Sequence, residues 1–560
     1  MSRRMLPLGV GESRRFSTRE EVDFVVVGSG AAGGVMAREL SRAGYSVVVL
    51  EQGPYIRPFQ FRHDEFAHFF GGELMGSPAE FPTTFRRTAS EKAEVPTQLP
   101  AAVYARLVGG SSVHFTANYW RFRPVDFQER SLLGEIPGTG FADWPITYDE
   151  LEPYYSKVEW DVGVSGAPGP DDPHRSRPFP HPPLPVKSSG VLLERGARAL
   201  GWTVKPAPMA ILSEPRAGRA ACGHCGFCMM YGCEFSAKSS TLATMIPEAE
   251  RTGRCEIRPE STVFRVETDA RGRVKEVRYF DAGGVEHAQS ARAVVLCANG
   301  AETPRLLLDS ESSLFPHGLA NGSGRVGKYL MFNGNGTVRG LFDEPLNEFK
   351  SVQVTRICQE WYDADPTRGF YGGGGVDGRY FGGPIFFGLG GLPPDAPTWG
   401  SGYKEALQDS FTRCMDIATH STSLALDTND VTLDPEVKDR FGRRALRITY
   451  KDHPDDVRMV EFLQDRAVEI LEAAGARQVW AAPVVEQSAG FHLLGTCRMG
   501  DDPDQAVVDR YHRTHEVPNL FICDGSSFVT SGRGQPTMTI QALAFRAAEA
   551  IGGAAARGEI

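Results

Sequence analysis

The chain has 560 residues, of which 41% are hydrophobic and 23% charged, and its formal net charge is −10. This length predicts about two domains with ample cores, and the negative charge argues against nucleic acid or an anionic membrane surface as a partner. No apolar run reaches the roughly 18–20 residues that a membrane-spanning helix needs, so no direct membrane insertion is expected.

The amino-terminal stretch before Glu12 contains basic residues but only a few apolar ones. A secretory signal peptide needs a longer apolar core. The sequence therefore predicts a cytoplasmic protein, or a periplasmic one only if a partner subunit carries the chain.

A dinucleotide-binding fingerprint follows the first predicted strand. Residues 22–27 read VDFVVV, as in a buried parallel strand, and the turn 28–33 reads GSGAAG before a helical pattern and a second strand, SVVVLE. In this G-x-G-x-x-G pattern Gly28 permits the tight turn, Gly30 the close approach of a pyrophosphate, and Gly33 the packing of helix on strand. Glu51 ends the second strand, where a carboxylate can accept from ribose hydroxyls. The whole context indicates a nucleotide site.

The middle of the chain predicts interleaved elements rather than consecutive domains. Residues 61–99 look irregular, as lids and cofactor covers often do. A helix is predicted after Thr147, with Glu150 completing a capping box, and the proline-rich stretch 166–187 predicts an extended loop. Alternating strands are expected over 255–298, and a later amphipathic helix should stop at Gly475.

Four of the ten cysteines are clustered with C-x2-C-x2-C-x4-C spacing. This spacing is close to that of ferredoxin iron–sulfur ligands, and zinc would suit the same thiolates. A compact cysteine-rich hairpin without metal, or one with disulfides, is an equal alternative. The candidate metal ligands are Cys222, Cys225, Cys228 and Cys233.

Several motifs together resemble the glucose–methanol–choline (GMC) family of FAD-dependent oxidoreductases over nearly the whole chain. They are GSGAAGG with Glu51, VGGSSVHF at 108–115, ANGAETPRLLL at 298–308, HLLGTCRMG at 492–500, and NLFICDGSSF through PTMTIQALA at 519–544. The cysteine cluster and WPITYDELEPYY are similar to the bacterial branch of gluconate 2-dehydrogenase flavoproteins and glucoside 3-dehydrogenases.

The resemblance implies an α/β (α+β overall) fold. It implies a Rossmann-like FAD-binding domain assembled from discontinuous segments, and a substrate domain built on an antiparallel sheet with helices. The expected FAD-binding segments are 18–60, 100–125, 220–335 and 488–560. Residues 61–99 would form the cofactor cover, and 126–219 with 336–487 the substrate-binding domain.

The resemblance also implies which residues bind FAD. Val263 would meet the adenine, Asp524 and Gly525 would approach the pyrophosphate, and Pro536 and Thr537 would begin the helix over the isoalloxazine. The full implied set is Gly28, Gly30, Ala31, Ala32, Gly33, Glu51, Gly109, Gly110, Ser111, His114, Val263, Asp524, Gly525, Pro536 and Thr537. At His114 some family members bond the flavin covalently, whereas here a histidine only packed beside the ring is favoured.

The implied chemistry is oxidation of a CH–OH group in a sugar, glycoside or other alcohol. An alcohol donates hydride poorly until its hydroxyl proton leaves, so a base is needed, and neutral histidine suits that role. His492 occupies the family's base position, and Gln535 stands where asparagine or a second histidine is usual. Glutamine keeps the amide donor and acceptor but cannot act as a second base. His512 and His515 are interpreted as surface or loop residues.

The resemblance leaves the electron acceptor and the reaction class open. The enzyme would pass electrons to oxygen, a quinone or a partner subunit, and an iron–sulfur cluster would favour the last two. Alternatives are an oxidase of a non-sugar alcohol, or a redox-neutral FAD lyase. The pocket walls are expected from 60–100 and 335–480, where the aromatic side chains Phe69, Phe70, Tyr371, Phe381 and Phe386 are interpreted individually as core.

Overall fold

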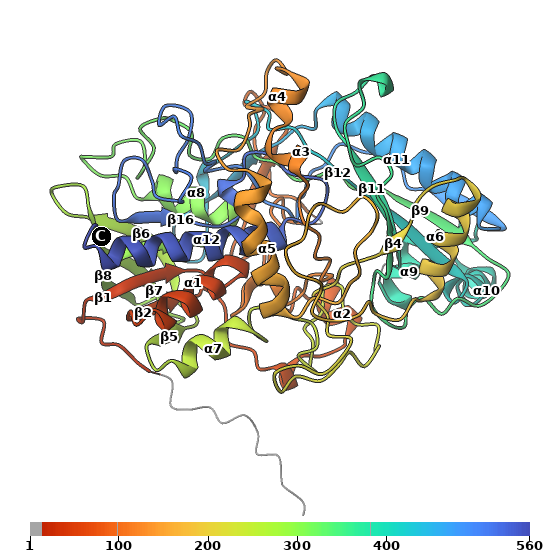
Figure 1. The fold of residues 1–560 in the computed structure, drawn as a ribbon, viewed down its shortest axis with the longest axis horizontal. Helices are drawn as coiled ribbons and strands as arrows, with labels where there is room; N and C mark the ends of the chain where they lie inside the picture. Colours follow the sequence, from red (N-terminus) through yellow and green to blue (C-terminus); the bar gives the residue numbers. More distant parts are fainter. Residues whose placement is uncertain (1–13, 98, 381) are drawn as a thin grey trace, which may run out of the picture.

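A computed structural model describes residues 14–97, 99–380 and 382–560 (Figure 1). The amino-terminal stretch on which the signal-peptide argument rests lies outside these ranges, and so does Phe381. In the described part, no helix is long and apolar enough to cross a membrane.

The first large sheet has a parallel core with an antiparallel extension. Its strand order is β5-β2-β1-β8-β7-β6, and β16 pairs in parallel with the end of β8. β5, β2, β1 and β8 are parallel neighbours, while β8, β7 and β6 form an antiparallel meander. The strands are β1 (Val22–Val27), β2 (Val47–Leu50), β5 (Cys255–Arg258), β6 (Thr262–Thr268), β7 (Val274–Phe280), β8 (Glu286–Leu296) and β16 (Leu520–Ile522).

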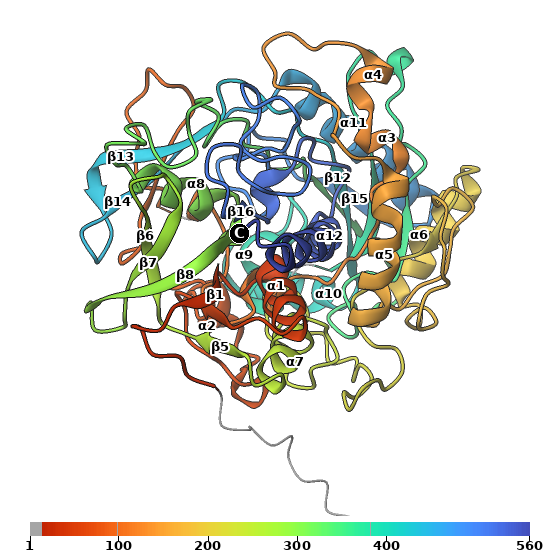
Figure 2. The same cartoon turned by 60° about the vertical axis from the view of Figure 1, so that its left-hand side comes forward.

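This parallel core is buried on both faces. Val25 and Val26 point to opposite faces of β1 and are both fully buried, which explains the unbroken apolar run in the sequence. Helix α1 packs against α12 and α7, and α12 also packs against α5, as Figure 2 shows near the carboxyl terminus. These helices are α1 (Ala31–Arg42), α5 (Tyr148–Val162), α7 (Met245–Arg251) and α12 (Thr537–Ala556).

The second large sheet is antiparallel and lies on the right in Figure 1. Its order is β15-β9-β12-β11-β10-β4, and helices α6 and α11 pack against it. The elements are β4 (Lys205–Pro206), β9 (Thr337–Leu341), β10 (Arg356–Cys358), β11 (Gly374–Arg379), β12 (Cys414–Ser421), β15 (Gln478–Ala481), α6 (Ser188–Ala199) and α11 (Pro454–Ala473). The predicted combination of a Rossmann-like sheet with an antiparallel sheet and helices is confirmed.

A third, three-stranded sheet corrects the expectation that 61–99 is irregular. In it β3 (Thr83–Arg86) runs parallel to β14 (Arg444–Thr449), which pairs antiparallel with β13 (Asp430–Lys438). The cover segment also contains α2 (Glu65–Phe69). The remaining helices are α3 (Pro124–Phe127), α4 (Glu129–Leu133), α8 (Asn299–Asp309), α9 (Pro384–Gly390) and α10 (Gly400–Phe411).

Two local predictions about helix ends are confirmed. The Thr147 hydroxyl accepts from the Glu150 N–H at 3.3 Å, and the Glu150 carboxylate accepts from the Thr147 N–H at 2.8 Å, forming the capping box of α5. Helix α11 stops before Gly475, which has the left-handed φ of +88° that glycine adopts without a Cβ penalty. The boundaries expected for the domains stay a prediction.

Candidate active site

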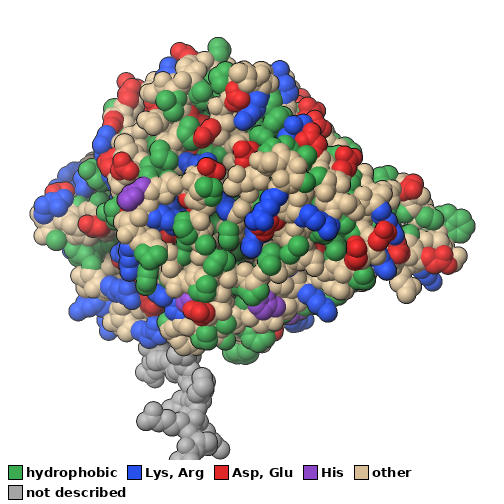
Figure 3. All heavy atoms as spheres, turned by 45° about the vertical axis from the view of Figure 1, so that its right-hand side comes forward, with side chains coloured by type: hydrophobic (Ala, Val, Ile, Leu, Met, Phe, Trp, Pro, Cys, Tyr) green, Lys and Arg blue, Asp and Glu red, His purple; other side chains and the backbone are tan. Residues whose placement is uncertain are grey.

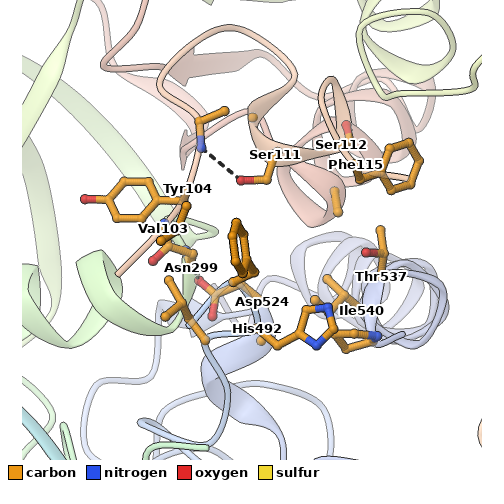
Figure 4. Close-up of a pocket in the computed structure, with 18 of the residues that line it drawn as sticks. Val103, Tyr104, Ser111, Ser112, Phe115, Asn299, His492, Asp524, Thr537 and Ile540 are labelled. Carbon is orange, nitrogen blue, oxygen red and sulfur yellow. Dashed lines mark hydrogen bonds between the residues drawn. The ribbon is translucent and has the colours of Figure 1, made fainter. Parts of the chain in front are cut away.

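A cavity of about 490 Å³ is lined by residues from both large sheets and by both ends of the sequence. The strand ends Val27 and Leu50 come from the first sheet, and Thr337 and Arg379 from the second. In Figure 4, Ser111, Ser112 and Phe115 lie on one side of this cavity, and His492 and Asp524 on the opposite side. Of the predicted cofactor and catalytic residues, Gly33 and Gly109 are the two that do not line it.

The three glycines of the fingerprint meet different surroundings. Gly28 has a φ of +92°, and a Cβ there would lie 2.6 Å from the Cys297 carbonyl oxygen. A Cβ on Gly33 would lie 1.9 Å from the Gly28 oxygen, so this glycine serves the packing of α1 on β1. A Cβ on Gly30 would meet only the Gly110 Cα, at 4.0 Å, and otherwise open cavity. Gly30 therefore leaves room for a ligand beside the amino terminus of α1, where unpaired N–H groups attract anions.

Glu51 lies inside this cavity with its carboxylate already oriented. One oxygen accepts from the Ser29 N–H at 3.1 Å and the Ser29 hydroxyl at 2.6 Å, and the other accepts from the Gly53 N–H at 3.0 Å. Burial raises the pKa of Glu51, and these donors oppose that shift. The unused acceptor positions on the carboxylate are suited to hydroxyl donors such as those of a ribose.

A second glycine turn, at Gly109 and Gly110, packs against the turn at Gly28–Gly33. Gly109 and Gly110 both have left-handed φ values, and a Cβ on Gly110 would lie 2.8 Å from the Gly30 Cα. The Ser111 hydroxyl accepts from the Ala105 N–H at 3.1 Å, drawn as the dashed line in Figure 4. This turn brings Ser111 and His114 to the same cavity as Glu51, and Val263 lines it as well.

His114 is buried against the cavity without a hydrogen-bond partner for either ring nitrogen among the described residues. Both polar atoms of the Asn118 side chain, which also lines the cavity, are likewise unpaired. Burial, with Lys238 as a second cause, lowers the pKa of His114 to about 3, so its ring is neutral. Buried polar atoms usually have partners, so these atoms fit a polar ligand that fills the cavity.

Asp524 bonds to the protein backbone and to a hydroxyl. Its carboxylate accepts from the Asn299 N–H at 3.0 Å, the Thr303 hydroxyl at 2.6 Å and the Ser526 N–H at 2.8 Å. Burial raises its pKa. Gly525 follows it at the cavity wall.

His492 and Gln535 line the same cavity, together with Pro536 and with Thr537, the first residue of α12. Burial, and then the nearby Arg379 cation, lower the pKa of His492 to about 4. The imidazole is therefore neutral near pH 7 and can accept a proton. The Gln535 side chain, which is half-buried, makes no hydrogen bond to another described residue.

A buried ion cluster holds the loop that leads to Gln535. The Arg533 guanidinium is fully buried and pairs with Asp126 at 2.5 Å and with Glu129. The Tyr362 hydroxyl donates to Asp126 at 2.6 Å, and the Tyr371 hydroxyl donates to Glu129 at 2.5 Å. Because two carboxylates and two hydroxyls surround this cation, the backbone two residues before Gln535 is firmly anchored.

The expected pocket walls are partly wrong. Among the described residues of 60–100 none lines the cavity, whereas Asn335, Arg379 and Gln487 do. These polar side chains carry no sequence motif, so the sequence did not single them out. The four described aromatic residues interpreted as core do not line the cavity. The core interpretation is wrong for Phe70, which is 49% exposed, and Tyr371 belongs to the ion cluster.

The four clustered cysteines do not line this cavity and form no metal site within the described chain. They line a separate space of about 20 Å³, but no three of the described His, Cys, Asp or Glu side chains are arranged to hold a metal ion. Cys225 is exposed whereas Cys228 is buried, and burial raises the pKa of the Cys228 thiol to about 12. The iron–sulfur and zinc interpretations therefore receive no support.

The surface interpretation of His512 is wrong. This residue is fully buried in its turn, and its Nδ1 lies 2.8 Å from the Ile522 carbonyl oxygen. His515 is half-buried, with Nε2 lying 3.0 Å from the Gly500 carbonyl oxygen. Neither lines the cavity, so His492 and His114 are its histidines in the described chain.

The fold and the cavity have the features of a dinucleotide-binding protein, and the family models identify the class as an oxidoreductase. Family models described as GMC oxidoreductase match residues 22–330 and 425–544. The chain belongs to the GMC oxidoreductase family, and this membership implies FAD as the cofactor.

The similar proteins include several named enzymes. The chain is 32% identical to 2-methyl-1,2-propanediol dehydrogenase of Mycolicibacterium austroafricanum, with 96% of each chain covered. It is 28% identical to the gluconate 2-dehydrogenase flavoprotein of Pantoea cypripedii, covering 95% of this chain and 94% of that one. A solved pyridoxine 4-oxidase from Mesorbium loti shares the fold, with a TM-score of 0.58, 21% identity, and coverage of 94% of this chain and 98% of that one.

Proposed function

We propose that the protein oxidises a CH–OH group of a sugar, glycoside or other polyol, with His492 as the base and FAD as the cofactor. The observation that carries this proposal is the placement of a neutral, half-buried histidine in the same cavity as residues 28–32 of the dinucleotide turn. The relatives named as dehydrogenases of a diol and of gluconate support the substrate class.

The residues present fit FAD. The open space at Gly30 and the amino terminus of α1 suit a pyrophosphate, and Glu51 suits the ribose. The unpaired nitrogens of His114 suit polar atoms of the cofactor or substrate without a covalent bond. The Asp524 turn and the Thr537 end of α12 would complete the site. In this proposal, the segments that carry these residues form the FAD domain, and 126–219 with 336–487 form the substrate domain.

In the proposed reaction the substrate loses a proton and a hydride to two different acceptors. When bound, FAD supplies the acceptor for the hydride that leaves the carbinol carbon. His492 takes the hydroxyl proton, and the substrate becomes a carbonyl compound. A neutral histidine is required at this step, and burial together with Arg379 keeps it neutral.

Gln535 would orient the substrate oxygen rather than remove its proton. Its amide can donate to the developing alkoxide, and it has no protein partner in the described chain that would compete. Arg379 and Asn335 supply further donors at the cavity wall. The final electron acceptor in this proposal is oxygen, a quinone or a partner subunit.

The test is anaerobic mixing of the holoenzyme with 2-methyl-1,2-propanediol, gluconate, fructose and simple glycosides. Bleaching of the flavin absorbance is expected with at least one of them. His492→Ala should lower the reduction rate by about 10²–10⁴-fold with FAD still bound. His515→Ala is the matched control, since this histidine lies outside the cavity. Cleavage of a substrate with persistent flavin colour would instead identify a lyase, and bleaching without any loss in His492→Ala would refute the base.

A further inference from the structure

Asn333 lies behind His492 and is almost completely buried, with 1% of its surface exposed. Its side-chain nitrogen donates to three carbonyl oxygens, those of Ser421 at 3.1 Å, Ser531 at 3.3 Å and Gly532 at 3.2 Å. An amide oxygen placed there would face three acceptors, so the orientation of this amide is determined by its surroundings.

The amide oxygen of Asn333 consequently faces the His492 ring. The distance between Asn333 Oδ1 and His492 Nδ1 is 3.1 Å. An amide oxygen only accepts, so Nδ1 must carry the proton of the neutral imidazole. The lone pair of the ring is then on Nε2. Arg379 is the charged group that acts on this ring, and it opposes a second proton.

The backbone sets this contact in register. Met331 and Leu494 form an antiparallel bridge, with N–H to oxygen distances of 3.1 and 3.2 Å in the two directions. Two residues further along each segment, in opposite directions, Asn333 and His492 stand opposite each other. Asn333 also has a left-handed φ of +64°, which asparagine tolerates better than most residues.

We propose that Asn333 is a positioning residue that holds His492 in the Nδ1-protonated tautomer, leaving Nε2 to accept the proton of the substrate. The proposal rests on the proposed role of His492 as the base. Through Ser531 and Gly532 the same amide ties His492 to the loop that ends at Gln535. One side chain therefore fixes both the tautomer of the base and its placement relative to the oxygen-binding amide.

The kinetic test compares two variants that accept a left-handed backbone. Asn333→Gly removes the acceptor, and we expect flavin reduction to slow by at least about tenfold and at most by the loss in His492→Ala. Asn333→Asp keeps an oxygen facing Nδ1 but turns its second oxygen toward the three backbone carbonyl oxygens, so it should lose less than Asn333→Gly only when this carboxyl is protonated. Ser531→Ala is the loop control, because its hydroxyl bonds to Ser423 N–H and Gly532 without touching His492.

A double-mutant cycle separates this role from a structural one. In the His492→Ala background, Asn333→Gly should cause no further slowing, because its effect passes through the missing ring. An undiminished further loss would show that Asn333 acts by shaping the loop, and would overturn the proposal. If His492→Ala itself has no effect, the proposed base fails instead, so the two failures are distinguishable.

A spectroscopic measurement tests the tautomer without turnover. Two-bond ¹H–¹⁵N spectra of protein labelled at histidine nitrogen, with the His492 signal assigned by its loss in His492→Ala, should show the proton on Nδ1 in the wild type and in Ser531→Ala. Asn333→Gly should shift this signal toward the Nε2-protonated form. A wild-type signal with the proton on Nε2 would overturn the proposal.

Discussion

The pKa of His492 should determine the lower limit of the pH range in which the enzyme is active. Burial and the Arg379 cation lower this pKa from 6.5 to about 4. In the proposed mechanism His492 must be neutral to act as the base, so the rate should be lost when the pH falls through the lowered pKa. We expect flavin reduction in stopped-flow mixing to be insensitive to pH around neutrality and to fall only near pH 4.

A matched variant sharpens this expectation. Arg379→Gln removes the cation that opposes protonation, so the acid limb should move upward toward 6.5. Circular dichroism over the same pH range controls for unfolding. A wild-type limb already centred at 6.5 would show that His492 is not held neutral by its surroundings.

At the scale of the element, the turn from β1 to α1 contains two glycines whose replacement by alanine should change the stability of the fold differently. Gly33→Ala places a Cβ 1.9 Å from the Gly28 oxygen, and should destabilise the fold by about 1–3 kcal/mol or more in urea unfolding. Gly30→Ala meets no close protein atom, so the apoprotein should keep its stability.

The same Gly30→Ala variant should bind FAD at least about tenfold more weakly, roughly 1.4 kcal/mol, because its methyl group enters the space kept for the ligand. Titration of the apoprotein with FAD measures this change. Wild-type affinity in Gly30→Ala would contradict the placement of the pyrophosphate beside α1.

At the scale of the whole molecule, the cavity joins the two large sheets, so its ligand should stabilise both. FAD at 100 times its Kd should add about 2.7 kcal/mol to the free energy of unfolding. ADP reaches only the first-sheet side in our proposal, so its Kd should be higher and it should raise the melting temperature less than FAD at equal concentration. Equal shifts would indicate that the second sheet contributes nothing to cofactor binding.

The face drawn in Figure 3 gives fewer functional indications than the cavity. On the face drawn in Figure 3, basic and acidic side chains are interspersed with hydrophobic ones over most of the area. This mixture on that face agrees with the modest net charge of −10 for a chain of this length. The residues that line the cavity are therefore a better guide to the substrate than this face.

Local sequence patterns predicted the parts of the fold that depend on neighbouring residues. The turn at Gly28, the capping box at Thr147 and the stop at Gly475 each follow from a few adjacent side chains. The pairing of β3 with β14 was not predictable in this way, because Thr83 and Leu446 are far apart in the chain. Strand pairing of this kind depends on tertiary packing rather than on local propensity.

The residues of the candidate site also differ in whether local sequence patterns could predict them. His492 and Glu51 belong to sequence motifs that predict their roles. Arg379 and Asn333 belong to no such motif, and only the strand pairing of the folded chain brings them to the site. The buried state of His512 was missed because its turn is polar in sequence but covered in space. For the cysteines, spacing predicted proximity but not the convergence of their side chains.

The parallel pairing of β16 with β8 has a consequence for the making of the protein. Strand β1 leaves the ribosome almost 500 residues before β16, an interval of roughly 25–100 s at about 5–20 residues per second. Throughout that time the helix α1 lacks its partner α12, and the cavity lacks His492 and the Asp524 turn. The cavity is thus completed only after β16 and α12 have been synthesised, and the nascent amino-terminal strands depend on their early neighbours, or on chaperones, until then.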